Sequence, residues 1–413
     1  MFSSNKLSDQ FVITQNKLGS GAFGSVYVAK LNNKDIAVKC ENKSNNNLTL
    51  IREFKICRKV YMVKKYLKYI YLCDELKNEL TNLIGENNEN KHENNNPNQT
   101  NIDEKIKELE KVKKSIDTYN KNNIIKIYHH LTTNNLLTIP DELGINFLIK
   151  NRCIPETFSY IECNDFNFLT MELCGDNFES VMEKFNFSER AKYFTASHLL
   201  NIMSCIHRCG VIHRDIKLSN IVFNKKLSNV SPDSYKKIYP VIIDMGLAKE
   251  YYKYEGERVI MIPPHATKSI TGTLRYISLN IHEFKSPTIV DDLISLAYAL
   301  VVIFTGKALP WIGHKKDTEK FDATKHTFTN CKCGYHKNKA NNDTKTKNTI
   351  AEVKFHTPLE DLVDSKYKFL IKWLKYLYSL KPKQLPSYNQ LYKMLNEESK
   401  QFDKLYMELE PKN

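Results

Sequence analysis

The fold of this chain is decided by the stretch HRDIKLSN, residues 213–220, together with DMG, residues 244–246. They place a carboxylate, a lysine, an asparagine and a second carboxylate in the order that a phosphoryl-transfer site needs. Such a site requires one residue to orient the attacking hydroxyl and oxygen ligands to hold Mg²⁺ against nucleotide phosphates. Asp215 fits the first role, and Lys217 can meet the charge of the moving phosphoryl group. We expect Asn220 and Asp244 to bind the metal.

A glycine-rich turn between two predicted strands supplies the upstream half of this site. The sequence LGSGAFGSV occupies residues 18–26, between alternating runs at 11–18 and 26–31. Glycines at this spacing let backbone N–H groups approach phosphate oxygens closely. The spacing alone also fits a tight turn or a dinucleotide-binding motif, but a strand rather than a helix follows it here, which argues against the dinucleotide reading. We expect nucleotide contacts from Leu18, Gly19, Ser20, Gly21, Ala22, Phe23, Gly24 and Val26.

A third predicted strand, IAVK at residues 36–39, ends in a lysine. A lysine in this position is usually only a solvated strand end, but the preceding glycine turn favours contact with the nucleotide phosphates. We therefore expect Ala37 and Lys39 to line the nucleotide site. Glu53, on the next predicted helix, is the expected ion-pair partner of Lys39, although a glutamate on a helix surface is also common.

These motifs together resemble those of a eukaryotic protein kinase, and the segment TGTLRYISLN at 271–280 is similar to that of the casein kinase I family. In that family a Ser-Ile-Asn-like triplet replaces the usual Ala-Pro-Glu, and SLN at 278–280 matches it. The late arginine that pairs with the Ala-Pro-Glu glutamate in most kinases is absent as well. Further matches are MELCG at 171–175, DDLISL at 291–296, LPW at 309–311 and TPLE at 357–360. The resemblance covers roughly residues 10–60, 165–315 and 345–400.

The resemblance implies an α+β bilobal fold with a small N-terminal lobe (11–171) of five strands and one helix. A larger, mainly helical C-terminal lobe (176–400) follows, with tails at 1–10 and 401–413. The family hinge places Met171, Glu172 and Cys174 against ATP. The resemblance also implies that Thr273 hydrogen-bonds near Asp215 and Lys217, and that Arg275 meets a phosphate or acidic residue of the substrate.

The implied activity is transfer of the γ-phosphoryl group of Mg-ATP to serine or threonine of acidic or phosphate-primed proteins. Met245 stands where the family has phenylalanine, and both side chains are large and apolar. Leu218 and Ser219 lean toward the vaccinia-related kinases, but those typically lack the arginine that Arg214 retains. Two alternatives therefore stay open: a vaccinia-related-type kinase, and a catalytically inactive kinase fold that acts as a scaffold through its insertions.

Composition bounds the remaining possibilities. The chain has 413 residues, a net charge of +14 and ten cysteines without disulfide-like spacing, which favours reduced thiols. Without an apolar run long enough to span a bilayer, we expect a soluble cytoplasmic or nuclear protein with no membrane partner. The positive charge is consistent with nucleic acid, but no RNA- or DNA-binding module is recognisable, so lysine-rich solvated faces are the expectation.

Three insertions interrupt the kinase pattern. The first, 61–123, carries apolar residues three or four apart on both sides of an asparagine-rich stretch, which predicts a coiled-coil-like helical hairpin with a disordered tip. It either docks a protein partner or merely protrudes. The second, 134–160, lies between strands expected at 124–128 and 166–170. The third, 315–348, is rich in lysine and offers four potential zinc ligands, although such loops often carry stray side chains of this kind: His326, Cys331, Cys333 and His336.

Overall fold

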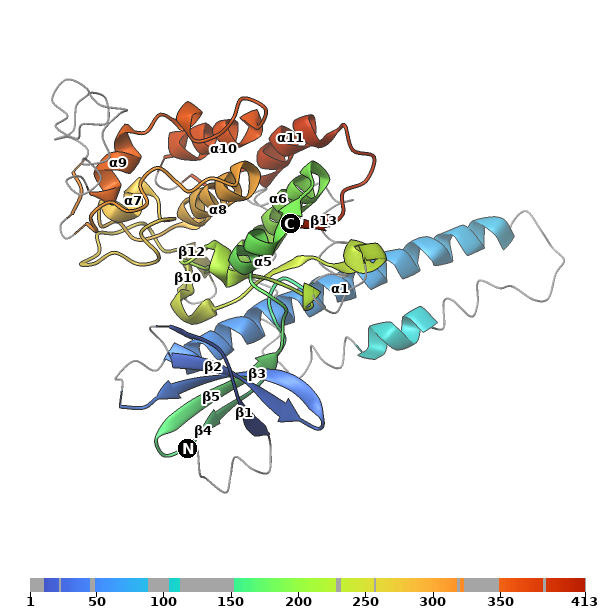
Figure 1. The fold of residues 1–413 in the computed structure, drawn as a ribbon. Coiled ribbons are helices and arrows are strands. Elements are labelled where there is room, and N and C mark those ends of the chain that lie inside the picture. The colour runs from blue at the N-terminus through green and yellow to red at the C-terminus, as the bar shows by residue number, and fades with distance from the viewer. Residues whose placement is uncertain are drawn as a thin grey trace.

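The chain folds into a small sheet lobe and a larger helical lobe (Figure 1). The structure, a computed structural model, describes residues 11–21, 24–44, 49–87, 104–111, 152–227, 232–255, 258–317, 320–322, 349–381 and 384–412. The two-lobed α+β arrangement confirms the fold class predicted from the sequence. Among the described residues, no helix combines the length and apolar character needed to cross a membrane.

An antiparallel sheet of five strands in the order β1-β2-β3-β5-β4 forms the small lobe. Its strands are β1 (Val12–Gly21), β2 (Gly24–Leu31), β3 (Lys34–Asn42), β4 (Thr157–Glu162) and β5 (Phe166–Glu172). Apolar residues from three of the strands share a buried cluster with Phe11, namely Ala29, Ile36, Val38, Cys40 and Phe168. Because side chains alternate along a strand, burial of Val38 and Cys40 on one face turns Lys39 to the other face of β3.

The fourth strand of the sheet comes from a different segment than we expected. β4 pairs with β5 through residues 157–162, which include the last residues of the predicted second insertion. Residues 157–160 of the predicted second insertion are therefore part of the sheet, and the stretch 124–128 that we expected to follow the helix as a strand lies outside the described residues. The sequence TFSYIE at 157–162 is rich in the β-branched and aromatic residues that strands favour, and its pairing with β5 gives it a place in the sheet.

The helix that packs on the sheet of the small lobe, α1 (Thr49–Asn87), is 39 residues long. It carries Glu53 near its start and continues without a break into the first insertion. Figure 1 shows that α1 extends well beyond the sheet. Residues 104–111 form a second helix. The segments 88–103 and 112–123 lie outside the described residues, so the hairpin and its tip stay predictions.

Helices build the second lobe. They are α5 (Phe178–Lys184), α6 (Glu189–Arg208), α7 (Leu279–His282), α8 (Ile289–Thr305), α9 (Ile350–His356), α10 (Lys368–Ser379) and α11 (Tyr388–Ser399). Ser188 caps α6, since its hydroxyl accepts the N–H of Ala191 at 3.2 Å. Helices α6 and α8 are buried along nearly their whole length and form the centre of the lobe, on which α10 and α11 pack.

Short strands and loops between α6 and α7 carry most of the predicted catalytic residues. The short strands of this segment are β7 (Val211–Ile212), β8 (Ile221–Phe223), β9 (Pro240–Ile242), β10 (Lys249–Glu250), β11 (Tyr252–Glu255) and β12 (Arg258–Met261). Two others lie outside it and pair with each other, β6 (Phe185–Phe187) before α6 and β13 (Leu409–Pro411) after α11. The cysteines that the structure describes are free thiols, and Cys40, Cys57 and Cys205 are buried. The four potential zinc ligands of the third insertion lie outside the described residues.

Candidate active site

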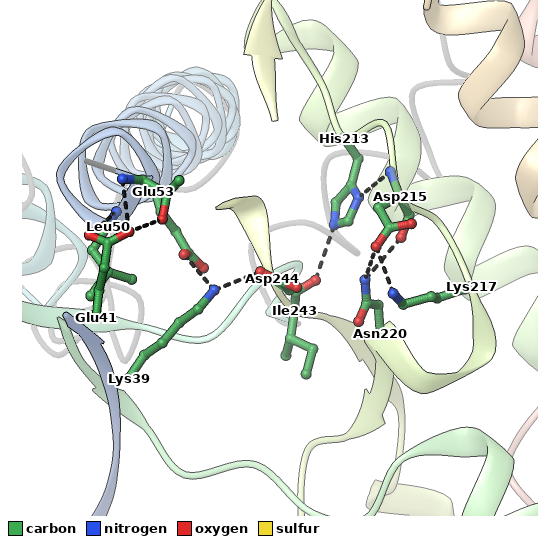
Figure 2. Close-up of polar contacts among 11 residues, drawn as sticks. Lys39, Glu41, Leu50, Glu53, His213, Asp215, Lys217, Asn220, Ile243 and Asp244 are labelled. Atoms are coloured by element: carbon green, nitrogen blue, oxygen red, sulfur yellow. Dashed lines mark hydrogen bonds and ion pairs between the residues drawn. The ribbon is translucent and has the colours of Figure 1, made fainter. Parts of the chain in front are cut away.

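Lys39 contacts two carboxylates, one from each lobe. Its Nζ lies 2.7 Å from Oε2 of Glu53 on α1 and 2.7 Å from Oδ1 of Asp244, which follows β9 (Figure 2). Lys39 and Glu53 are buried, whereas the side chain of Asp244 is 31% exposed. The predicted Lys39–Glu53 pair is therefore present, and one of the predicted metal ligands lies beside it.

The charges of this cluster support one another. Burial alone would lower the pKa of Lys39, but the carboxylates of Glu53 and Asp244 outweigh burial and raise that pKa above its usual range. Burial raises the pKa of Glu53, and the ammonium of Lys39 acts in the opposite direction. Burial also opposes ionisation of Asp244, yet contact with Lys39 lowers the pKa of that carboxyl below its ordinary value. Asp244 is thus held as a carboxylate.

Glu41 fixes the start of α1 and was missed by the sequence reasoning. Its carboxylate accepts the N–H of Thr49 at 3.0 Å, the hydroxyl of Thr49, and the N–H of Leu50 at 3.4 Å. The first turn of α1 has no acidic residue of its own, so Glu41 provides the negative charge that a helix N-terminus favours. Glu41 lies two residues after Lys39 on β3, and both side chains therefore leave the same face of the strand.

Three predicted side chains, those of Lys217, Asn220 and Thr273, gather around Asp215 in the catalytic loop. Lys217 Nζ lies 2.7 Å from Oδ2 of Asp215, and the hydroxyl of Thr273 donates to Oδ1 at 2.7 Å. Lys217 also donates to the hydroxyl of Thr273 at 3.3 Å. The amide nitrogen of Asn220 donates to the backbone carbonyl and to Oδ2 of Asp215, at 3.0 and 3.2 Å. The predicted approach of Thr273 to Asp215 and Lys217 is confirmed.

Asp292 on α8 holds the backbone of this loop, a role that we did not assign from the sequence. Its carboxylate accepts the N–H groups of His213 at 2.6 Å and Arg214 at 2.8 Å, and its Oδ2 lies 3.0 Å from Nε2 of His207. Burial opposes ionisation of Asp292, but these donors lower its pKa below the ordinary value. Arg214 has a positive φ of 70°, a strained conformation that the two backbone bonds to Asp292 stabilise.

His213 and Asn220 tie the loop to Asp244. The ring of His213 accepts the N–H of Asp215 at Nδ1 and donates from Nε2 to the carbonyl of Ile243, so it is the neutral Nε2–H tautomer. The N–H of Ile243 donates to the carbonyl of Asn220 at 2.9 Å. Asp244 follows directly with φ 66°. The backbones of the two predicted metal ligands are thus linked through Ile243, whose contact with His213 is drawn in Figure 2.

The glycine-rich turn lies between β1 and β2, and β2 pairs with the strand that carries Lys39. Gly24 has φ +130°, and a Cβ there would lie 2.0 Å from the carbonyl oxygen of Cys40, so only glycine fits. At Gly19 and Gly21 a Cβ would meet nothing within 4 Å. Val26 is the cross-strand partner of Lys39. Of the turn residues predicted to contact nucleotide, Ala22 and Phe23 lie outside the described residues.

The predicted hinge residues Met171 and Glu172 lie at the end of β5, and Cys174 follows them. Ala37 on β3 is the cross-strand partner of Met171 at the end of β5, and Glu172 pairs with Arg152. Beyond Cys174, the N–H of Gly175 donates to the carbonyl of Phe223 at 2.7 Å and joins the hinge to the helical lobe.

Arg275 lies two residues beyond Thr273 and points toward α5. Its Nη1 is 3.5 Å from Oε1 of Glu179, and both side chains are substantially exposed. Its carbonyl accepts the indole N–H of Trp311 at 2.7 Å. The residue predicted to meet a substrate phosphate is therefore near the catalytic loop, with an acidic neighbour that we did not foresee.

The sheet lobe contributes Lys39 and the helical lobe contributes Asp215, Asn220 and Asp244. A lysine, two carboxylates and an asparagine in this arrangement define a phosphotransferase site. Comparison with known families gives the particular class: residues 108–395 match the model of the Protein kinase domain family. This range is more than half of the chain, and the protein belongs to that family. The match begins after Lys39 and Glu53, which the structure brings to the matched region through Asp244.

Proposed function

We propose that this protein is a serine/threonine protein kinase of the casein kinase I type, which transfers the γ-phosphoryl group of Mg-ATP to acidic or phosphate-primed proteins. The observation that carries the proposal is the convergence of Lys217 and Thr273 on the carboxylate of Asp215. A hydroxyl already donates to Oδ1 of Asp215, so the carboxylate is placed to orient an incoming hydroxyl and to take its proton late in the transfer.

The residues present fit Mg²⁺. Asp244 is held ionised, and because the amide nitrogen of Asn220 donates to Asp215, its carbonyl oxygen is left to face elsewhere. Carboxylate and amide oxygens are ligands that Mg²⁺ accepts. Bound there, the ion would neutralise charge on the nucleotide phosphates. Lys39 and Lys217 would oppose the remaining negative charge, and such electrostatic stabilisation is usually the largest contribution to rate.

The proposed preference for acidic or primed sites rests on Arg275. Its ion pair with Glu179 is exposed, and such pairs contribute only about 0–1 kcal/mol. A substrate phosphate carries more charge and more acceptor oxygens than one carboxylate, so it can displace Glu179 from Arg275. Glu179 would at the same time weaken binding of substrates that offer no negative charge in this position.

The test is phosphate incorporation from labelled ATP into a peptide library that contains primed and unprimed acidic sequences. We expect Asp215→Asn to lower kcat by about 10²- to 10⁴-fold. Asp35→Asn, which changes an exposed carboxylate paired with Lys30, is the control and should leave kcat unchanged. Incorporation that is absent in the wild type, or equal in Asp215→Asn, would favour the inactive scaffold. Preference for chromatin proteins over primed peptides would favour a vaccinia-related-type kinase.

A further inference from the structure

Lys354 lies on the buried face of α9, and its ammonium nitrogen has three acceptors. Nζ donates to the backbone carbonyls of Ile277 at 2.6 Å and Leu274 at 3.0 Å, and it lies 3.3 Å from Nε2 of His282. Lys354 is only 4% exposed. An ammonium group has three N–H donors and no acceptor, so these three partners match the charged side chain completely.

Two aromatic rings complete the surroundings of the ammonium. Nζ lies 5.0 Å from the ring centre of Trp311 and 5.4 Å from that of Tyr298, and the two rings meet edge to face. A cation within about 6 Å of an aromatic face is attracted to it, more strongly when water is excluded. The pocket of Lys354 is therefore built for a cation as well as for three hydrogen bonds.

The third partner, His282 on α7, belongs to a buried pair. Its Nδ1 lies 2.9 Å from Oδ2 of Asp317, which leaves Nε2 as the acceptor for Lys354. Burial lowers the pKa of His282, against the effect of Asp317, so the imidazole is neutral. Burial likewise lowers the pKa of Lys354 to about 7, and Asp317 opposes that shift. The titratable and charged groups around Lys354 are therefore His282, Asp317 and Tyr298.

The two carbonyls that Lys354 holds flank the residues proposed to meet the substrate. Leu274 and Ile277 enclose Arg275, and the carbonyl of Thr273 accepts the N–H groups of Tyr276 at 2.8 Å and Ile277 at 3.2 Å. This turn contacts the catalytic loop on one side through the Thr273 hydroxyl. On its other side α9 holds it through Lys354.

A second anchor lies a few residues further along. Ser278 donates to Oδ1 of Asp291 at 2.5 Å, and the amide of Asn280 lies 3.2 Å from both oxygens of that carboxylate. These contacts fix the start of α7. They do not reach Leu274. The turn that bears Thr273 and Arg275 is held instead by Lys354 on α9 and by the indole N–H of Trp311, which donates to the carbonyl of Arg275.

Burying a lysine is costly, and an apolar side chain of similar volume often stabilises a protein as well or better. A lysine adds directed hydrogen bonds in this position, because two of its N–H donors fix two carbonyls of one turn. We propose that Lys354 is a positioning residue that holds the Leu274–Ile277 turn against the catalytic loop and so sets the KM for the protein substrate. This inference rests on the proposed kinase function.

The experiment compares full-length wild type with Lys354→Met, which keeps the length of the side chain but removes its donors. Lys354→Gln, which retains two neutral N–H donors, tests partial rescue. Lys307→Met is the control, since the side chain of this lysine is 71% exposed and forms an ion pair with Asp364, which is also largely exposed. Peptide KM, ATP KM and kcat are measured for each, together with hydrogen–deuterium exchange at the amides of Tyr276 and Ile277.

For Lys354→Met we expect the peptide KM to rise by about 10- to 100-fold, because displacement by about 1 Å near a reacting group can cost 10²-fold. The ATP KM should stay within about twofold, since Lys39 and the glycine-rich turn are not altered. Exchange at the two amides should become faster, and Lys354→Gln should lie between wild type and Lys354→Met. The control should match the wild type in every measurement.

Unchanged peptide KM and unchanged exchange in Lys354→Met would overturn the inference, as would equal losses of peptide and ATP affinity. If Lys354→Met does not fold, the same comparison is made with Lys354→Gln, where faster exchange with unaltered ATP KM supports the inference and unaltered exchange refutes it. A wild type that phosphorylates no peptide would refute the proposed function instead. The exchange measurement would still decide whether Lys354 holds the turn.

Discussion

Replacing Lys39 by methionine tests both the structural and the chemical role of this residue. Its ammonium lies 2.7 Å from a fully buried carboxylate, Glu53, and the side chains are only 8% and 3% exposed. Removing one partner of such a pair leaves an uncompensated buried charge and costs about 3–5 kcal/mol. We therefore expect Lys39→Met to lower the free energy of unfolding by about that amount, in addition to abolishing phosphoryl transfer.

A second substitution supplies the internal check. In Lys39→Met/Glu53→Leu no buried charge is left alone, because Asp244 is partly exposed and can be hydrated. The double variant should recover most of the lost stability and remain inactive. The matched control is Lys30→Met on β2, where the pairing distance is similar, 2.8 Å, but both side chains are more than half exposed. It should cost no more than about 1 kcal/mol.

The loss of unfolding free energy in Lys39→Met, its stability deficit relative to the wild type, should also depend on pH. Burial holds the pKa of Glu53 above its ordinary value, and without Lys39 nothing in the pair opposes that shift. Glu53 then binds a proton more tightly in the folded variant than in the unfolded chain. The stability deficit is therefore largest above the pKa of Glu53 in the folded variant, and it shrinks as the pH falls. Urea unfolding at pH 8 and pH 5.5 measures this. A double variant no more stable than Lys39→Met, or a deficit independent of pH, would refute the reasoning.

Three further outcomes follow from the site. Gly272 has φ +99°, and a Cβ there would lie 2.5 Å from the carbonyl oxygen of Arg214. Gly272→Ala should therefore strain the turn beside the catalytic loop and lower kcat at least about tenfold, as measured by steady-state kinetics. Asn280→Ala should lower the free energy of unfolding by about 1–3 kcal/mol, read from urea melts, because buried Asp291 loses a donor. EDTA should stop phosphate incorporation and excess Mg²⁺ should restore it, while stimulation by EDTA would contradict the assigned metal ligands.

The sequence reasoning succeeded where function depends on residues that are close in the chain or belong to one specific motif. Asp215, Lys217 and Asn220 lie within six positions, so the local backbone brings them together once the loop is anchored. Lys39 and Glu53 were paired across a strand and a helix, which is a longer inference, but the glycine turn before Lys39 restricted the fold enough to make it.

What the sequence could not supply depends on contacts between distant segments. The pairing of 157–162 with β5 is a tertiary contact that the strand propensity of this stretch does not specify. Glu41 and Lys354 could have been suspected from their patterns, since the first shares a strand face with Lys39 and the second falls on the apolar face of α9 with Ile350 and Val353. Their partners, however, are mostly backbone groups, joined by the Thr49 hydroxyl for Glu41 and the His282 ring for Lys354, and no sequence pattern identifies these contacts.

The length of α1 puts the partner of Lys39 and the start of the first insertion on one element. Ile56, Cys57, Val60 and Val63 are buried in the same cluster as the helical lobe, so the helix is held along the turns that follow Glu53. At about 1.5 Å per residue, Glu53 lies about 15 Å from Val63 on one side and Asn87 about 36 Å on the other. The 2.7 Å contact between Lys39 and Glu53 is therefore made at the end of α1 that packs against both lobes, whereas the first insertion begins at its opposite end.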